Sequence, residues 1–168
     1  MPSTHLIKRV RATPEQLFDM IADVENYPVF INLISKLRIT KKISDTDFEA
    51  EAIVVYKMLR ETFRSKIHID REKKFIHVNK AEQSGAVKTL DNKWYFHELS
   101  DGSTVVDFHV EVSLKAFPLN ILVREKMDRA TEVIMGAFER RAAQVCDIVG
   151  DETPSDQLMA ELSSVKFV

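Results

Sequence analysis

The chain has 168 residues, of which 45% are hydrophobic and 30% are charged, so it is long enough to bury a sizeable core as one domain. Its 24 basic and 26 acidic residues give a formal net charge of −2, which excludes a general electrostatic attraction to nucleic acid, and we expect no DNA partner. The single cysteine, Cys146, excludes an intramolecular disulfide and a cysteine-rich zinc site.

The first elements that the sequence predicts are a strand and a capped helix. Residues 5–11 are long enough for a strand. Thr13 can cap the helix that follows, Pro14 suits its first position, and Gln16 would complete a capping box. Asn26-Tyr27-Pro28 should end the helical region, because a residue before proline disfavours the α conformation.

From about Ile34 to Leu114 the apolar residues alternate with a period of two, which predicts strands. Turns at residues 44–47, 71–73 and 101–102 set the registers, since each hairpin should place apolar residues opposite each other. The predicted pairs are Leu37–Val54, Ile39–Ala52, Ile43–Phe48, Ile67–Val78, Ile69–Ile76, Trp94–Phe108 and Phe96–Val106. The result is an antiparallel meander whose other face is wetted, with Arg64, Lys66, His68, His77, Asn79, Tyr95, His97, Asp107 and His109 on it.

After Pro118, apolar residues recur every three or four positions over a length that indicates a long amphipathic helix. The stripe consists of Val123, Met127, Ala130, Ile134, Phe138, Ala142, Val145 and Val149, and Gly150 is the expected stop. Residues 151–168 contain Thr-Pro, serine and acidic residues, so we expect a mobile C-terminal tail with room for a short helix.

Together these elements predict an α+β fold in which a curved antiparallel sheet of about six or seven strands wraps around a long C-terminal helix, with two short helices after the first strand. A helix is about 10 Å wide, whereas such a sheet spans roughly 30 Å, so the sheet must curl. The space between them is either packed with large side chains or left as a cavity, and the sequence leaves both open. The predicted lining, which would bind an apolar ligand, is Ala52, Val54, Tyr56, Phe63, Ile67, Trp94, Phe96, Phe108, Val110, Met127, Ile134 and Phe138.

The connection into the long helix is unusually apolar. Phe117, Leu119 and Leu122 lie where a polar loop is the rule, beside Lys115 and Lys126. They either plug the end of the sheet or contact a membrane surface peripherally. The opening residues lack the apolar run of a secretory signal, and no window approaches the ~18 apolar residues of a membrane span, so we expect a cytoplasmic protein with at most a peripheral contact at the inner membrane.

No combination of residues indicates catalysis or metal binding. His68 and His77 should face each other across a hairpin, but their neighbours supply no acidic or thiol ligand, so we expect a solvated face there. Nucleophile-elbow, phosphate-loop and dinucleotide motifs are absent from the sequence. Tyr56 and, with less suitable parity, Arg64 are the polar candidates for orienting a ligand headgroup. We expect no catalytic residue, no metal and no cofactor.

Three segments resemble a known family. They are Asp23-Val24-Glu25-Asn26-Tyr27-Pro28-Val29-Phe30 after the capped helix, Lys93-Trp94-Tyr95-Phe96 on a late strand, and Phe117-Pro118-Leu119 before the long helix. Over residues 1–149 the chain resembles the coenzyme-Q-binding START-domain family, within the helix-grip superfamily of polyketide-cyclase-like and lipid-transfer proteins. The resemblance implies a START-like domain over residues 1–150 that binds ubiquinone and supports respiratory electron transfer without chemistry of its own. The same family includes ribosome-association toxins.

Three functions therefore stay open. The leading hypothesis is a carrier or chaperone for an apolar, lipid-like molecule, with ubiquinone as the first candidate. The second is a toxin-like protein that binds the ribosome through the wetted face of the sheet. The third is a polyketide-cyclase-like enzyme, although we expect a protein that is not an enzyme.

Overall fold

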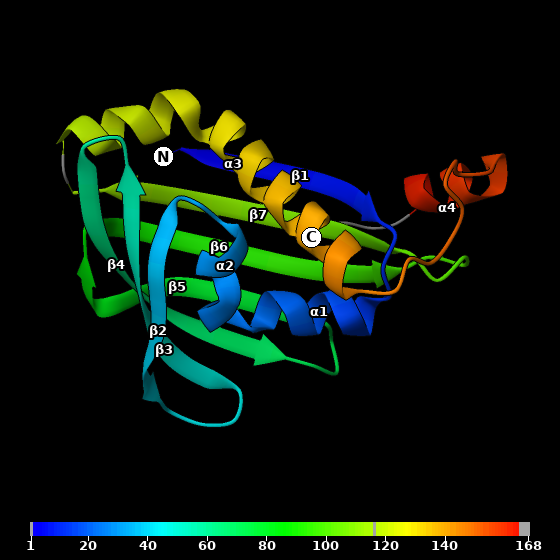
Figure 1. Ribbon diagram of the computed structural model, residues 1–168, viewed down its shortest axis with the longest axis horizontal. Helices are drawn as coiled ribbons and strands as arrows, with labels where there is room; N and C mark the ends of the chain where they lie inside the picture. The colour runs from blue at the N-terminus through cyan, green and yellow to red at the C-terminus, as the bar shows by residue number, and fades with distance from the viewer. Residues whose placement is uncertain (1, 116, 165–168) are drawn as a thin grey trace.

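The computed structural model describes residues 2–115 and 117–164, except for the side chains of Leu59, residues 117–119 and Leu122. The strands form one antiparallel sheet in the order β1-β7-β6-β5-β4-β3-β2, which curves around α3 (Figure 1). They are β1 (Ser3–Val10), β2 (Ile34–Lys42), β3 (Asp47–Tyr56), β4 (Leu59–Asp70), β5 (Phe75–Gly85), β6 (Val87–Glu98) and β7 (Thr104–Leu114). The helices are α1 (Pro14–Ala22), the 3-10 turn η1 (Val24–Asn26), α2 (Tyr27–Phe30), α3 (Phe117–Val145) and α4 (Asp156–Ser164). The predicted fold class, with its seven-stranded sheet and long helix, is confirmed.

The start of α1 is capped as predicted, but the capping box is not formed. The Thr13 hydroxyl accepts a hydrogen bond from the backbone N–H of Gln16 at 3.3 Å. The Gln16 side chain, however, points away from Thr13 and bonds Asp147 beyond the end of α3, accepting from its backbone N–H at 2.9 Å. Gln16 therefore connects α1 to the segment that follows α3.

The helical region continues past the point where the sequence predicted its end. Tyr27–Phe30 forms the single turn α2, with Pro28 among its first two residues. Proline is tolerated there because the first N–H groups of a helix have no partner inside it. The missing N–H of Pro28 therefore costs no helical hydrogen bond. As a result, α2 carries Phe30 over the same side of the sheet as α1 (Figure 1).

Two of the three predicted hairpins have the predicted register. Ile67 pairs with Val78 and Ile69 with Ile76, and Trp94 pairs with Phe108 and Phe96 with Val106. The hairpin of β2 and β3 is different, because Leu37 pairs with Ala52 and Ile39 with Ala50. The predicted register was thus wrong by two residues at Leu37 and Ile39. It was wrong by one residue at Phe48, which pairs with Lys42 and not with Ile43, because irregularities between Ile34/Lys36 and Ile39/Lys41 shift the pairing along these strands. At Leu37 and Ile39 a shift of two keeps both side chains on the predicted face, so alternation alone does not distinguish the two registers there, whereas beyond the irregularity after Ile39 the offset is odd.

The long helix α3 lies along one side of the concave face, over β7 and β1 (Figure 1). Lys8 on β1 forms an ion pair with Glu139 at 2.8 Å, and the Thr4 hydroxyl donates to Asp128 at 2.5 Å. The helix ends at Val145 and not near Gly150 as predicted. Val145 is exposed, and the backbone N–H of Val149 donates to the carbonyl of Arg11 at 3.1 Å. Bonds to the start of the chain therefore replace the last predicted helical turn.

The outer, convex face of the sheet is not wetted throughout. Asp107 was predicted to face solvent, yet its side chain is fully buried. Next to it along β7, Val105 packs with Leu99 and with Leu158 of α4. The short helix for which the sequence left room in residues 151–168 is therefore present and contacts the sheet, while the predicted mobility of that segment stays a prediction. No helix in the described part of the chain is both long and apolar enough to cross a lipid bilayer.

Candidate functional site

The concave face of the sheet is the candidate binding site, and the structure divides its predicted residues into two groups. Half of them are buried, namely Ile67, Trp94, Phe96, Phe108, Met127 and Phe138. The other half, namely Ala52, Val54, Tyr56, Phe63, Val110 and Ile134, are only half-buried. The two alternatives left open by the sequence, a packed core and an accessible lining, therefore apply to different parts of one face.

The first part is a packed aromatic core under α1 and α2. The ring centroid of Trp94 lies 4.6 Å from that of Phe108 and 5.3 Å from that of Phe138. Phe138 in turn contacts Tyr27 at 5.1 Å and Phe30 at 5.4 Å between centroids. Edge-to-face packing of this kind fills space and adds stability beyond that of area burial, so these side chains serve as core.

Tyr27 is a half-buried residue at the edge of this core. Its hydroxyl donates a hydrogen bond to the backbone carbonyl of Ile21. Burial raises the pKa of Tyr27 well above its ordinary value, and the nearby Asp23 carboxylate raises it further. The phenol is therefore neutral throughout the physiological range and acts as a packing residue with one satisfied donor.

The second part is apolar but incompletely covered. It consists of half-buried side chains that face inward from β3, β4 and β7, in particular Val54, Phe63 and Val110. Phe63 also packs, with Leu90, Val112 and Val123, around the buried pair Val87 and Leu114. Because α3 follows β7 and β1, a helix about 10 Å wide leaves inward side chains of β3 and β4, such as Val54 and Phe63, without a full cover, and Val110 of β7 is half-buried although α3 contacts that strand.

Asn92 is a polar member of this face that the sequence analysis missed. Its side-chain oxygen accepts from the Trp94 indole N–H at 2.8 Å, and its amide donates to the His109 carbonyl at 2.8 Å. Its position two residues before Trp94 on the same strand is the signal that would have found it. Tyr56 lies at the end of β3, on the same side of the strand as Val54 by alternation, and is half-buried, while its role toward a ligand stays a prediction.

Arg64, the weaker headgroup candidate, does not reach the concave face. Its Nε donates to Glu51 at 2.9 Å on the outer side of the sheet. His68 and His77 lie opposite each other as predicted, and each contacts a carboxylate: His68 that of Asp47 at 3.2 Å, and His77 that of Asp91 at 2.5 Å. The prediction that these histidines have no acidic neighbours was therefore wrong.

Two pockets described on the protein surface both lie on the outer face. One, of about 320 Å³, is lined by residues of β1, β6 and β7, including His5, Lys93 and His109. The other, of about 440 Å³, is lined by residues of β2 to β5, including Glu51 and Arg64. An enclosed cavity beneath α3 stays a prediction. The side chains of Phe117, Leu119 and Leu122, predicted to contact a membrane, lie outside the described part of the structure.

Comparison with known proteins identifies a family and several solved structures that share this architecture. Residues 10–139 match the family described as polyketide cyclase / dehydrase and lipid transport. The chain belongs to this family. Within it, the chain is similar to the ribosome association toxin RatA of Rickettsia prowazekii, with 27% identity over 133 residues that cover 79% of this chain and 90% of the relative.

Solved structures show the same helix-grip fold. An 18 kDa protein of Caulobacter crescentus is 31% identical, with a TM-score of 0.70 over 86% of this chain and 97% of its own. A START superfamily protein of Mycobacterium smegmatis has a TM-score of 0.71 at 18% identity, covering 84% and 97% of the two chains. The Zhui aromatase/cyclase of a Streptomyces species has a TM-score of 0.74 at 14% identity, covering 84% and 93%. At such identities the last two show the fold alone.

Proposed function

We propose that this member of the polyketide cyclase / dehydrase and lipid transport family is a carrier of an apolar, lipid-like molecule, with ubiquinone as the first candidate, and that it is not an enzyme. The observation that carries the proposal is the half-buried apolar surface around Val54, Phe63 and Val110, inside the curve of the sheet. Apolar surface left partly uncovered in a folded chain favours burial by a ligand, since burial is worth about 25 cal/mol per Å².

The chemistry of this surface suits a long hydrocarbon chain with a small polar head. Its inward side chains are mostly aliphatic or aromatic, which supports binding rather than proton transfer. The Tyr56 hydroxyl, at the end of β3, is a hydrogen-bond donor for a carbonyl of a quinone ring. The family also includes cyclases by its description, so the absence of catalysis is part of the proposal.

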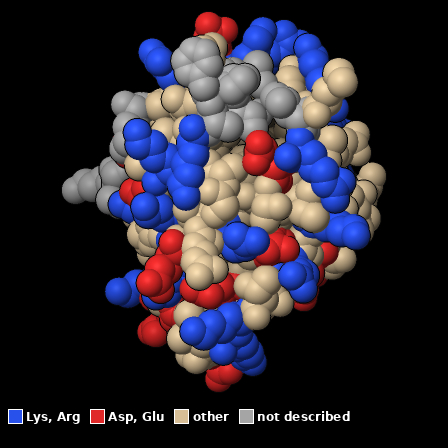
Figure 2. All heavy atoms as spheres, turned by 90° about the vertical axis from the view of Figure 1, so that its left-hand side faces the viewer, with Lys and Arg blue, Asp and Glu red and all other residues tan. Residues whose placement is uncertain are grey.

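Loading such a ligand requires contact with a membrane, and one end of the molecule fits this role. The tip of the β3–β4 hairpin carries Met58, which is fully exposed, between the basic residues Lys57 and Arg60. Hydrogen bonds from Lys115 to Ala86, and from Ala86 to Thr62, hold the start of α3 beside this hairpin. Figure 2 views this end, where Lys and Arg side chains gather in the upper half. Exposed apolar and basic side chains together favour an anionic lipid surface, in this case that of the inner membrane facing the cytoplasm.

The decisive experiment compares the same substitution on the two faces of one strand. Val54→Phe fills the inward surface, whereas Val55→Phe adds the same volume on the outer side, because successive residues of a strand alternate. Each protein is purified from cells that make ubiquinone, extracted with organic solvent and examined by mass spectrometry. We expect the wild type and Val55→Phe to carry quinone, and Val54→Phe to carry at least about tenfold less.

Two results would contradict the carrier proposal. One is a wild-type protein that yields no apolar molecule on extraction. The other is equal loss of the molecule in Val54→Phe and Val55→Phe, since that would trace the effect to stability and not to the inward surface. Circular dichroism of both variants establishes that each is folded.

Ribosome binding is the second candidate, and the specific observation in its favour is the similarity to RatA of Rickettsia prowazekii over 79% of this chain. The outer face offers exposed lysines for phosphate contacts, among them Lys66 and Lys73. If the chain binds ribosomal subunits, cosedimentation should weaken with rising salt, because phosphate contacts release counterions. It should weaken further in the double variant Lys66→Glu with Lys73→Glu. Cosedimentation that changes neither with salt nor in this variant would argue against ribosome binding.

A further inference from the structure

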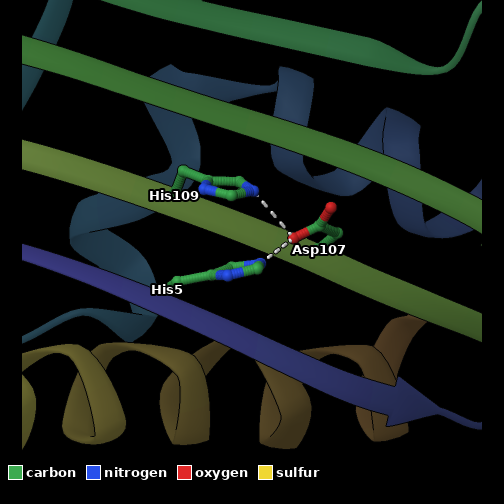
Figure 3. Close-up of side chains that lie close together, drawn as sticks. All are labelled: His5, Asp107 and His109. Carbon is green, nitrogen blue, oxygen red and sulfur yellow. Dashed lines mark hydrogen bonds and ion pairs between the residues drawn. The ribbon is translucent and has the colours of Figure 1, made fainter. Parts of the chain in front are cut away.

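A cluster of two histidines and one aspartate lies on the outer face of the sheet, apart from the concave surface. His5 on β1 pairs directly with His109 on β7, and Asp107 precedes His109 by two residues on the same strand. Residues at this spacing point to one side of a sheet, so all three side chains gather on the outer face. Figure 3 shows both imidazole rings directed at the Asp107 carboxylate.

The donor atoms of the cluster converge on one point. The Nε2 atom of His5 lies 2.5 Å from Oδ1 of Asp107, and the Nε2 atom of His109 lies 3.1 Å from the same oxygen. The two rings are stacked, with centroids 3.7 Å apart and planes 18° from parallel. Strand pairing thus holds two imidazole nitrogens and one carboxylate oxygen close together. No loop has to become ordered to bring them into place.

The burial of the Asp107 carboxylate is compensated at one oxygen only, Oδ1, which both histidines contact. Its side chain is fully buried, and its Oδ2 atom has no hydrogen-bond partner among the described residues. Its direct neighbours on the flanking strands, Ile7 and Tyr95, bring no positive charge. A buried carboxylate is costly unless a cation or several donors balance it, so this site favours an added positive charge.

The cluster is also open to solvent on one side. The His5 side chain is 41% exposed. His5 and His109 line the outer-face pocket of about 320 Å³, together with the carboxylates Asp91 and Glu111. An ion can therefore enter from solvent, and water molecules can complete its coordination.

We propose that His5, Asp107 and His109 form a binding site for a divalent transition-metal ion. Two imidazoles and one carboxylate are ligands that suit Zn²⁺ and its neighbours, whereas Mg²⁺ and Ca²⁺ prefer oxygen ligands alone. Such an ion cross-links the edge strand β1 to its neighbour β7, and so holds the start of the chain against the rest of the sheet. The site is independent of the proposed carrier function.

The test is a titration of chelator-treated protein with Zn²⁺, followed by calorimetry and thermal unfolding. We expect saturable binding of one ion per chain and a rise in Tm, since a ligand that binds only the folded state stabilises it. His5→Ala and His109→Ala should each weaken Zn²⁺ binding by at least about tenfold. Even mutation of a residue that only hydrogen-bonds to a metal ligand lowers metal affinity by this much. Co²⁺ gives a second readout, because its visible absorption reports nitrogen and oxygen ligation directly.

A matched control lies on the same face of the sheet. His68 contacts only Asp47 among the described carboxylates and stands outside the cluster, so His68→Ala should bind Zn²⁺ like the wild type. His5→Ala is expected to fold, because the wild-type side chain is partly exposed, and circular dichroism checks this. The proposal is overturned if wild-type protein shows no saturable binding, if His5→Ala binds as tightly as wild type, or if His68→Ala loses binding equally.

Discussion

At the scale of single residues, Arg9 and Asp101 form a largely buried ion pair. The Arg9 guanidinium donates to the Asp101 carboxylate at 2.7 Å, and the side chains are only 11% and 13% exposed. The carboxylate also accepts from the hydroxyl of Ser103 at 2.5 Å and from its backbone N–H at 3.0 Å. A buried carboxylate with this many donors links the start of the chain to the β6–β7 turn.

This pair predicts a dependence of stability on pH. Burial alone raises the pKa of Asp101, but the hydrogen bonds from Ser103 and Arg9 outweigh it and hold the pKa well below its ordinary value. The folded-state pKa is thus lower than the unfolded one, so the stabilisation is present above about pH 4 and is lost as the pH falls further. Asp101→Asn should cost ~2 kcal/mol at pH 7 and less at pH 2.5.

Urea denaturation of wild type and Asp101→Asn at several pH values measures this difference. Asp151→Asn is the matched control, because Asp151 is an exposed carboxylate in the same region. A difference between wild type and Asp101→Asn that stays constant from pH 7 to pH 2.5 would show that the carboxylate has no special role.

At the scale of elements, α4 covers part of the outer face near the start of β7. Leu158 is buried against Leu99 and Val105. Glu161 accepts hydrogen bonds from the backbone N–H of Ser100 at 2.9 Å and from its hydroxyl at 2.6 Å. The helix therefore has both an apolar anchor and a polar anchor on the β6–β7 turn.

These contacts predict that α4 contributes to stability. Leu158→Ala should lower the free energy of unfolding by about 2–4 kcal/mol, because it removes a buried leucine. Met159→Ala is the control, since Met159 is exposed on the same helix and should change stability little. If the segment is mobile, as its composition predicts, both substitutions will leave the urea midpoint unchanged.

At the scale of the whole molecule, the two ends of the concave face differ in character. One end is closed by the aromatic packing of Trp94, Phe108 and Phe138 under α1 and α2. The other end has incompletely covered apolar side chains next to the basic hairpin tip at Lys57 and Met58. In the proposed carrier, a ligand would therefore enter at the end that carries the basic hairpin tip.

This asymmetry predicts where liposome binding can be abolished. Phe117→Asp with Leu122→Asp should eliminate association with vesicles that contain anionic lipids, because it places two charges in the apolar first turns of α3. Val133→Asp with Val145→Asp is the control, since both residues are exposed further along the same helix. Flotation of each protein with vesicles is the measurement, and the circular dichroism should not change. Equal flotation of both double variants would rule out this contact.

The elements and faces of the sheet could be predicted from the sequence because they depend on local periodicity. The alternation through Trp94 and Phe96, with a turn at residues 101–102, was enough to pair them with Phe108 and Val106. The pairing of β2 with β3 could not be predicted in the same way, because its irregularities leave no trace in the alternation. The burial of half of the candidate site residues could not be predicted for a related reason, since the sequence shows that Phe138 faces the sheet but not that Tyr27 and Phe30 pack against it. Whether these residues contact a ligand stays a prediction.

The sequence by itself thus determined the order of elements and the two faces of the sheet, because both follow from residue spacing along the chain, while the family was indicated by the resemblance of three short motifs. Only the tertiary structure decided which inward side chains stay half-buried, and it alone brought His5 to Asp107 across 102 residues. The physical reason is that burial and convergence depend on how strands distant in sequence pair and on which of them one narrow helix covers.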